Sequence, residues 1–511
     1  MEPGEPQNHR GIQVHQQANG GRERVPPHYG RFPMTVQFRP ADDDDRPATS
    51  LADLKPDKDR TSRSHLRLAY RFAEAHEGDF IFVPGISSKG KNEGWMRWTG
   101  DHWDLAEGGE VHTALWALME SAWAEAMNDP ALQADIRSAQ SASGTDGVLR
   151  QAARLPEFNR SASSLDNDRL LLNLPNGTYD LRSFTLKEHD PRDLITKVAR
   201  AEYHPDASAA RWERFINEVI PDPDIRAFIQ RYVGVALCGE VREHALPILV
   251  GDGRNGKGTF YEAISWMQGD YAGQADPELF MHKEGAHPVG QMALMGKRWI
   301  VVTETQRGRR MNAATMKRLT GGDPITARWM HGNPVTFEPS HTPILVTNWM
   351  PKISGDERAA WERIHVVEFN TYIPPERRDK HLKDTLRTEV DGIFLWAIKG
   401  WYDYISRGWQ LDPPASVLAH TEEQREESDY VAHFLREAVV LDPRGSIIQA
   451  DLRSEYNRWR LMPEFARDEA PEYDARDFSR VVRQFSRSIG TGRGHANKTI
   501  FTGIRRKNPG E

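Results

Sequence analysis

The sequence between positions 251 and 259 reads Gly251-Asp252-Gly253-Arg254-Asn255-Gly256-Lys257-Gly258-Thr259. An apolar run at 245–250 precedes it, and a stretch compatible with a helix, 260–267, follows it. Strand, glycine-rich turn and helix are the context that a phosphate-binding loop requires. Glycines let successive backbone N–H groups converge on phosphate oxygens, and the helix N-terminus adds partial positive charge. We therefore predict that residues 251–259 bind a nucleotide and that Lys257 reaches its β- and γ-phosphates.

Length and composition fit a multidomain globular protein. The 511 residues suggest about three or four domains, and 38% hydrophobic with 28% charged residues is ordinary for such proteins. No apolar run approaches the ~20 residues of a membrane helix, and the N-terminus lacks a signal-peptide layout. The single cysteine, Cys238, lies in an apolar helical pattern, which favours a buried side chain, no disulfide and a reducing, cytoplasmic compartment.

The chain before the loop divides into three parts. Residues 1–62 show no sustained periodicity and are expected to form a disordered tail. Residues 63–205 predict a small α+β domain that begins with an amphipathic helix. Residues 206–240 predict a helical layer of two helices separated by a Pro-Asp-Pro-Asp turn.

Two hairpins are predicted inside the α+β domain. Alternating aromatic residues around a Thr-Gly-Asp turn indicate one at Trp95–Trp103, and an Asn-Gly turn at 176–177 indicates the other. Tryptophans beside basic residues can stack on nucleic-acid bases. The alternation favours packing in a core or on a sheet face instead.

After the loop, three predicted strands each have a polar or charged residue at one end. The buried strand at 299–303 is followed by Glu304, and the strand at 343–347 by Asn348. In phosphate-loop enzymes an acid on a neighbouring strand holds Mg²⁺ through water and polarises the attacking water. An amide can bond the γ-phosphate or orient water without adding negative charge. Arg363 begins another strand and could stabilise transition-state charge as an arginine finger.

A short helix and a hairpin lie between these strands. Asn312 is a plausible N-cap and Gly321-Gly322 a plausible stop, so the helix between them presents Lys317 and Arg318. Residues 324–337 read as two strand-like arms around a polar His-Gly-Asn tip.

Taken in order, residues 251–259, Glu304, 317–323, Asn348 and Arg363 resemble the superfamily-three helicases, and more narrowly the phage and plasmid primase–helicase group. The similarity extends from about residue 66 to the C-terminus. Its most specific part is Lys317-Arg318-Leu319-Thr320-Gly321-Gly322-Asp323-Pro324-Ile325-Thr326-Ala327-Arg328. The resemblance implies an AAA+-like phosphate-loop core at 241–410 that assembles into a ring, commonly a hexamer.

The resemblance also implies roles for single residues. ATP would lie between subunits, with Lys257, Glu304 and Asn348 on one subunit and Arg363 donated by its neighbour. The hairpin would point into the central channel, so DNA contacts are expected from Lys317, Arg318, Arg328 and His331. Many members place Ser or Thr directly after the loop lysine as a Mg²⁺ ligand, but this chain has Gly258. Thr259 and Glu304 would then hold Mg²⁺, partly through water.

The C-terminal third closes the core and adds a domain. Residues 384–409 predict a helical stretch, and Pro413-Pro414 with the charged run 422–427 predicts a hinge. Three amphipathic helices, a Gly-rich turn at 490–494 and a strand at 499–504 predict a winged-helix domain within 411–511. From Arg476 onward there are nine Lys or Arg against two Asp or Glu, which favours DNA contact despite the overall charge of −7.

The expected function is that of a ring-forming, Mg-ATP-dependent DNA helicase for phage, prophage or plasmid replication, working in the cytoplasm of the host cell. Its partners would be single-stranded and forked DNA, copies of itself, and a separate primase or replicative polymerase, but no membrane. We expect no primase activity on this chain, since 62 low-complexity residues cannot hold a polymerase domain.

Two alternatives remain open. One is a replication initiator or DNA-binding protein with a weak or silent ATPase, which Gly258 favours. The other is a small-molecule kinase, because the order Gly-Lys-Gly-Thr resembles nucleoside monophosphate kinases. A kinase would leave the hairpin and the winged-helix domain unexplained.

Overall fold

The computed structural model describes residues 62–85, 94–106, 109–281, 288–303, 309–328, 334–353, 357–463 and 470–508. The predicted N-terminal tail, Glu304 and the tip of the 324–337 hairpin, including His331, lie outside these residues. Predictions for them stay predictions.

A parallel five-stranded sheet forms the centre of the fold. Its order is β13 (Ile364–Glu368), β7 (Leu246–Val250), β12 (Thr342–Thr347), β9 (Trp299–Thr303) and β8 (Ala272–Ala275). Near-continuous apolar runs form the inner strands because parallel sheets are buried on both faces. Residues alternate between two cores, so that Val301 faces one and Val302 the other.

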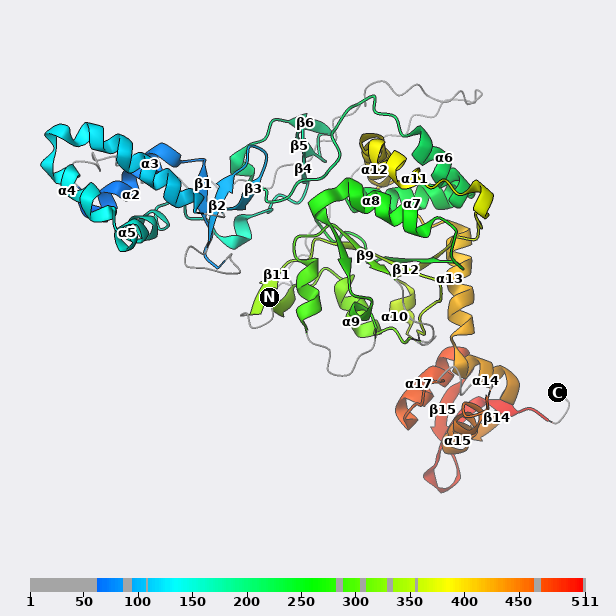
Figure 1. Ribbon diagram of the computed structural model, residues 1–511. Coiled ribbons are helices and arrows are strands. Elements are labelled where there is room, and N and C mark those ends of the chain that lie inside the picture. Colours follow the sequence, from blue (N-terminus) through cyan, green and yellow to red (C-terminus); the bar gives the residue numbers. More distant parts are fainter. Residues whose placement is uncertain are drawn as a thin grey trace, which may run out of the picture. The chain divides into compact units, whose positions relative to one another are not determined.

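Helices cover both faces of this sheet. Figure 1 shows α7 (Pro223–Val235), α8 (Lys257–Gln268) and α12 (Val390–Ser406) on one side of β9 and β12, with α9 (Ala313–Leu319) and α10 (Arg358–Trp361) on the other. The predicted helical layer is therefore confirmed as α6 (Ala210–Val219) and α7. Cys238 is fully buried, as predicted.

The segment before this core has its own hydrophobic cluster and two small sheets. The cluster joins residues of α2 (Ser64–His76), α3 (Glu110–Glu125), α4 (Pro130–Ala139) and α5 (Ala142–Ala152). One sheet holds β1 (Phe80–Phe82), β2 (Trp95–Trp98) and β3 (Trp103–Leu105); the other holds β4 (Leu171–Leu174), β5 (Gly177–Asp180) and β6 (Thr185–Lys187). Both predicted hairpins are confirmed, but the turn of the second lies at 175–176 and not at 176–177, because Gly177 pairs with Leu174. Trp95 and Trp103 are at most 4% exposed, so the packing interpretation is correct.

The predicted hinge at 413–427 is wrong. Residues Ala415–Glu427 form a helix, α13, in which Val417 and Thr421 are buried. The Thr421 hydroxyl accepts a hydrogen bond from the Val366 N–H of β13 at 2.9 Å. A charged run reads as a linker in the sequence, but here the charges lie on the outer side of a helix whose inner side packs on a strand.

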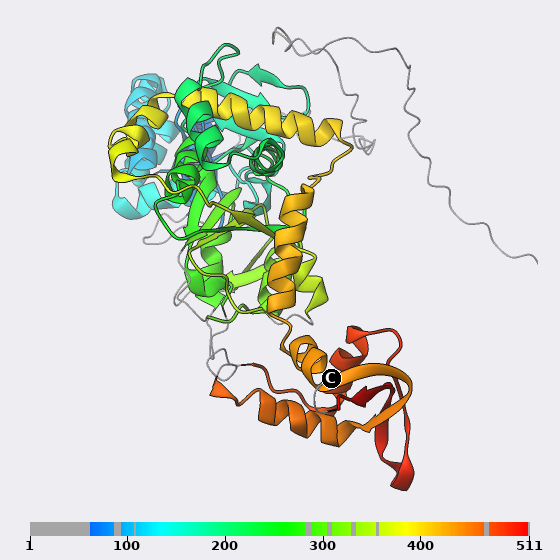
Figure 2. The ribbon, with the colours of Figure 1, turned by 90° about the vertical axis from the view of Figure 1, so that its right-hand side faces the viewer.

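In the described residues of the C-terminal segment, three helices accompany a three-stranded antiparallel sheet (Figure 2). The helices are α14 (Tyr430–Ala438), α15 (Gln449–Trp459) and α17 (Ala475–Phe485), and the strands are β14 (Val439–Ile448), β15 (Gly490–Arg493) and β16 (Thr499–Arg506). Residues 490–493 were expected in a turn, yet they pair with β16. Cross-strand pairing overrides the weak strand propensity of glycine here.

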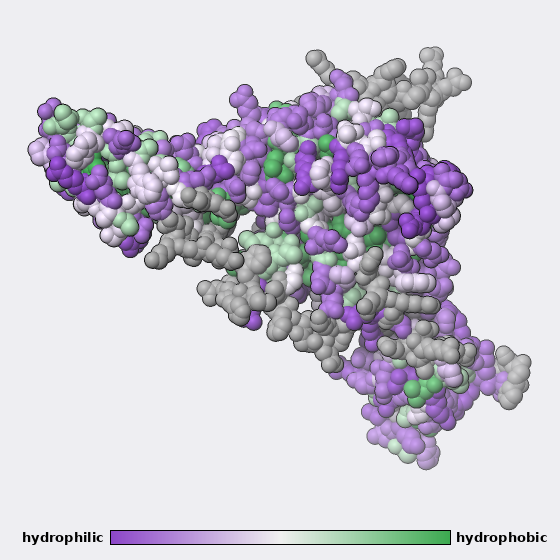
Figure 3. Space-filling view, viewed as in Figure 1, coloured by the Kyte–Doolittle hydropathy of each residue, from purple (hydrophilic) through white to green (hydrophobic). Residues whose placement is uncertain are grey.

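The surface agrees with the low mean hydropathy of −0.68. Most of the coloured face in Figure 3 is hydrophilic, with hydrophobic residues in small groups. Within the described part of the chain, none of the helices combines the length and apolar character needed to cross a membrane.

Candidate nucleotide site

The predicted strand, loop and helix are present at 246–268. Gly253 and Gly256 have φ angles of +89° and +90°, a region that side chains with a Cβ atom rarely adopt. A Cβ atom on Gly256 would also lie 2.5 Å from the Val219 side chain of α6. Two glycines of the loop are therefore required by its backbone, and Gly256 stands at the N-cap of α8.

Lys257 lies at the start of α8 and is only 5% exposed. Its Nζ atom donates to the Gly251 carbonyl at 2.6 Å, to Asn255 Oδ1 at 3.2 Å and to Asn348 Oδ1 at 3.4 Å. Burial lowers the pKa of this ammonium, and the nearby Asp252 carboxylate partly opposes the shift. All three acceptors are neutral oxygens, so the buried charge suits an anionic ligand such as a nucleotide phosphate.

Asn255 has a second function that its place in the motif did not suggest. It is 4% exposed, and its Nδ2 atom donates to the Phe369 carbonyl at 2.8 Å while Oδ1 accepts from Lys257. This side chain fixes the loop to the end of β13 and orients the lysine. The sequence offered one signal, an amide inside a glycine-rich loop, but not its partner.

Asn348 follows β12, which pairs directly with β7. The Thr347 hydroxyl accepts a hydrogen bond from the Trp349 N–H at 3.2 Å. This contact closes a tight turn with Asn348 at its centre. The structure thus brings Asn348 and Lys257 together, as the sequence predicted. Between β7 and β12 the strand order reverses, since β13 lies on the far side of β7, and ligands of open parallel sheets bind at such a point.

The predicted acidic residue, Glu304, follows β9, the next strand of the sheet after β12. β9 pairs with β12 and ends at Thr303, whose hydroxyl accepts from Gln274 Nε2 at 2.9 Å. The carboxyl end of β9 therefore lies one strand from Asn348. Glu304 itself is outside the described residues, and its role in catalysis and Mg²⁺ binding stays a prediction.

Arg363 lies at the opposite edge of the sheet, where the amino ends of the strands meet. It precedes β13, and its carbonyl accepts from the N–H of Leu246, the first residue of β7. Its Nη1 atom donates to the Lys317 carbonyl at 2.7 Å and to Thr320 Oγ1 at 2.8 Å. The structure does not bring Arg363 together with Lys257 of the same chain.

Thr259 lines a cavity of about 470 Å³ beside α8. Trp266 stands in this cavity with the Arg200 guanidinium 4.0 Å and the Arg387 guanidinium 4.5 Å from its ring centroid. Residues two apart on a helix do not share a face, so Thr259 and Lys257 point in different directions. The Mg²⁺ role of Thr259 stays a prediction.

The predicted DNA-contacting residues gather on α9 and the hairpin. The N-cap of α9 is confirmed, because Asn312 Oδ1 accepts from the Thr315 N–H at 3.0 Å. Lys317 forms an ion pair with Glu357 at 3.2 Å, and Arg318 is exposed. The hairpin is confirmed as β10 (Ile325–Arg328) paired with β11 (Pro334–Phe337), and Arg328 at its end is exposed.

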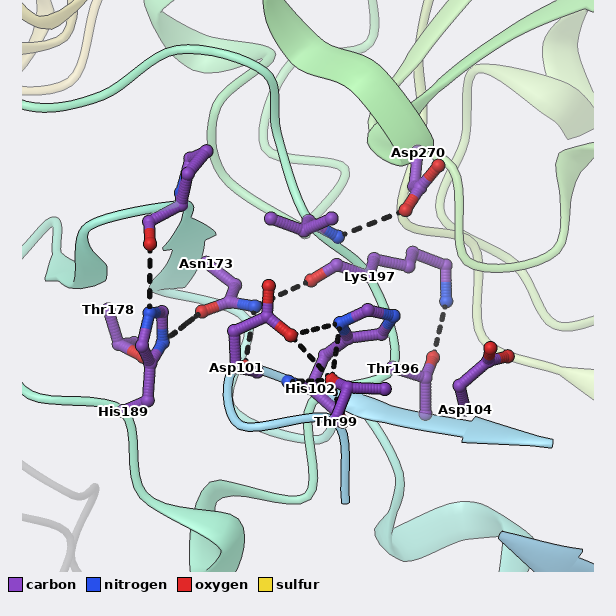
Figure 4. Close-up of polar contacts among 12 residues, drawn as sticks. Thr99, Asp101, His102, Asp104, Asn173, Thr178, His189, Thr196, Lys197 and Asp270 are labelled. Carbon is purple, nitrogen blue, oxygen red and sulfur yellow. Dashed lines mark hydrogen bonds and ion pairs between the residues drawn. The ribbon is translucent and has the colours of Figure 1, made fainter. Parts of the chain in front are cut away.

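A second polar cluster joins the first hairpin to β4 and to the segment 196–198 (Figure 4). Asn173 is fully buried and donates to the carbonyls of Asp101 at 2.9 Å and Lys197 at 3.1 Å. Burial alone would raise the pKa of Asp101, but hydrogen bonds with Thr99 and His102 outweigh it and hold the pKa below its usual range. These polar groups form hydrogen bonds with one another. The cluster therefore has a structural role, since it connects the hairpin, β4 and the segment 196–198.

Two families match the chain. The family described as "D5 N terminal like" matches residues 69–221, and a family of unknown function, DUF5906, matches residues 249–363. The first covers most of the segment before the core and continues through α6, and the second runs from the end of β7 to Arg363.

Relatives are found among viral proteins. A protein named putative helicase from Acanthamoeba polyphaga mimivirus is 26% identical over 340 residues, which cover 61% of this chain and 35% of the relative. One named putative helicase from Frog virus 3 is 23% identical over 402 residues, covering 61% and 41%. One named putative primase from African swine fever virus is 24% identical over 344 residues, covering 61% and 35%. The chain thus spans well under half the length of these relatives.

Among solved structures, the apo structure of the NrS-1 C terminal region overlays on 60% of this chain and 77% of its own, with 11% identity and a TM-score of 0.38. The described fold is that of a mixed α/β protein with a central parallel sheet. Within that class, the N-terminal family match and the viral relatives make the chain similar to phage and viral primase–helicase proteins.

Proposed function

We propose that this protein is an ATP-dependent DNA helicase that unwinds DNA during the replication of a phage, prophage or plasmid. The observation that carries the proposal is the position of Lys257, whose buried ammonium has only neutral acceptors and meets Asn348 at the point where the strand order reverses. The helicase and primase names of the viral relatives support a function in replication.

The chemistry follows from these positions. Backbone N–H groups of 251–258 and the N-terminus of α8 would receive the phosphates, and Lys257 would neutralise the β- and γ-phosphates. Asn348 would orient the attacking water or the γ-phosphate without adding negative charge. Mg²⁺, for which Glu304 is the predicted ligand, would neutralise the charge that develops on the phosphate oxygens.

The position of Arg363 supports catalysis between subunits. The five residues of β7, at about 3.3 Å each, separate the two edges of the sheet by roughly 16 Å. An arginine at the amino edge therefore suits the nucleotide of a neighbouring copy better than its own. This geometry is the one a closed ring, such as a hexamer, would use.

DNA binding would involve two basic surfaces. The first comprises Lys317, Arg318 and Arg328, with His331 at the predicted hairpin tip. The second is the C-terminal segment, whose described helices and strands we interpret as a winged-helix domain and in which 476–511 is strongly basic. A separate primase or polymerase would complete the replication machinery.

The decisive experiment measures ATP hydrolysis with and without single-stranded DNA, and strand separation on a forked duplex. The wild type should hydrolyse ATP faster with DNA and unwind the fork, while Lys257→Ala should do neither because it loses nucleotide binding. Lys380→Ala removes an exposed lysine outside the site and should behave as wild type. Absence of ATPase activity with DNA at every protein concentration would refute the proposal.

A DNA-binding initiator with a silent ATPase is the second candidate. It is favoured by Gly258, which lacks the hydroxyl that usually follows the loop lysine, together with the position of Thr259 on the cavity side of α8. The same assay separates the two, because a silent ATPase would bind ATP and DNA without turnover. Negative-stain imaging with ATP and forked DNA would test ring formation in either case.

A further inference from the structure

The side chain of Arg363 is held on one side only. Its Nη1 atom donates both hydrogen bonds that the described residues offer it, to the Lys317 carbonyl and to Thr320 Oγ1. Nε and Nη2 have no acceptor in the described part of the chain, and the residue is half-buried. The guanidinium is therefore anchored through one nitrogen, with its other edge available to an anion.

The two acceptors of Arg363 lie at the C-terminal end of α9. We call the Lys317 carbonyl and Thr320 Oγ1 together the arginine cradle. Thr320 is fully buried, and its hydroxyl donates to the Met316 carbonyl at 2.8 Å. Because its single proton is used there, the oxygen must present a lone pair to Arg363. Position 320 therefore requires a side-chain hydroxyl. Valine would fill the space but could accept no hydrogen bond from Arg363.

Neighbouring contacts hold the cradle in place. His341 Nε2 contacts the Leu319 carbonyl at 2.9 Å, and the Lys317 ammonium pairs with Glu357 of the segment that leads to Arg363. Gly321 is also constrained, since a Cβ atom there would lie 2.7 Å from the Lys317 carbonyl. The close approach of helix end and arginine therefore depends on this glycine.

We propose that Thr320 is a positioning residue, which orients Arg363 so that the free edge of its guanidinium meets the phosphates bound by a neighbouring copy. The proposal rests on the proposed ATPase function. The helix that provides these acceptors also carries Lys317 and Arg318, and the chain continues from it through 321–324 into β10.

The test compares Thr320→Val with Thr320→Ser in the full-length protein. Valine should lower kcat for DNA-stimulated ATP hydrolysis roughly tenfold to a hundredfold, the range for a lost hydrogen bond to a charged group, and leave KM for ATP within about twofold. Serine keeps the hydroxyl and should restore most of kcat. Thr315→Val, a change on the same helix away from the cradle, should match wild type.

Subunit mixing separates positioning from a folding defect. Thr320→Val subunits keep an intact Lys257, and Lys257→Ala subunits keep an intact cradle, so mixed rings should be more active than either variant alone. If valine does not fold, Thr320→Ala against Thr320→Ser gives the same comparison. Wild-type kcat in the valine variant, equal loss in the serine variant, or no recovery on mixing would overturn the proposal. An inactive wild type would instead refute the ATPase function itself.

Discussion

The two edges of the central sheet carry the two ends of the proposed chemistry, and they are built differently. At the carboxyl edge Lys257 is 5% exposed and has three neutral acceptors from three segments. At the amino edge Arg363 is half-buried and anchored through one nitrogen. The first edge is closed around its cation, whereas the second presents its cation outward.

This difference is what an interfacial ATPase needs. A nucleotide's own subunit can enclose the phosphates from the start, so the binding edge is tight. A group that acts on a neighbour must stay accessible until the subunits meet, yet it must keep its orientation. One-sided anchoring at a buried helix end satisfies both requirements.

The largest expected effect comes from removing the outward cation. Arg363→Ala should lower kcat by about 10³-fold or more, the range measured for arginine fingers, while ATP binding stays near wild type. Kinetics of ATP hydrolysis and titration with a fluorescent ATP analogue would measure the two quantities. Loss of ATP binding would show that the two edges are not functionally separate.

Acid should destabilise the protein through a histidine beside the arginine cradle. Burial lowers the pKa of His341 to about 4, and this residue bonds the Leu319 carbonyl beside the arginine cradle. Between pH 6.5 and 4 the unfolded chain binds a proton at this histidine that the native protein does not, so stability falls as pH falls. The 2.5-unit difference corresponds to on the order of 3 kcal/mol at about 1.4 kcal/mol per unit.

Urea unfolding at pH 7, 5.5 and 4 would measure this loss. His341→Gln keeps a donor for the carbonyl but does not titrate, so its stability should depend less on pH in this window. His365, whose pKa burial also lowers to about 4, remains in both proteins and contributes the same pH dependence to each. Identical pH dependence of wild type and variant would contradict the assignment.

A smaller effect is expected from Asn348 at the carboxyl edge. Asn348→Ala removes one of three acceptors of Lys257 and the amide that would orient water, so kcat should fall roughly tenfold to fiftyfold, about 1.4–2.3 kcal/mol. Asn348→Asp should be worse than alanine, because a carboxylate would pair with Lys257 and repel the γ-phosphate. Rapid-quench measurement of a single turnover would test this order.

Much of this fold could be predicted from local patterns. The loop with its strand and helix, the N-cap at Asn312 and both hairpins follow from signals that neighbouring residues create. Contacts between distant segments could not be predicted. Gly234 and Gly400 allow α7 and α12 to cross closely, since a Cβ atom on either would lie about 2 Å from backbone of the other helix, at Trp401 and Gln230. Nothing in the helical periodicity of either segment marks these glycines.

The candidate site shows the same limit. Each residue type was predictable from its place at a strand end, and the pairing of Lys257 with Asn348 follows from parallel topology. The anchoring of Arg363 by Thr320 was not predictable, because it depends on where a helix ends relative to a strand 43 positions later. The charged run at 422–427 was misread as part of a hinge, although Glu, Gln and Arg favour helix and Arg425 pairs with Glu422 one turn earlier.

The finest test of the comparison concerns Gly258, at the closed edge. A Cβ atom there would meet only the Glu262 side chain at 4.0 Å, so Gly258→Ser fits without strain. Its hydroxyl would follow the loop lysine directly, where Mg²⁺ is usually bound. Because Thr259 lies on the cavity side of α8, we expect serine to lower the Mg²⁺ concentration for half-maximal ATPase severalfold and to leave the effect of Arg363→Ala unchanged.

Gly258→Ala is the matched control, since it adds the methylene without the hydroxyl. An equal Mg²⁺ requirement in all three proteins would show that Thr259 already supplies the hydroxyl.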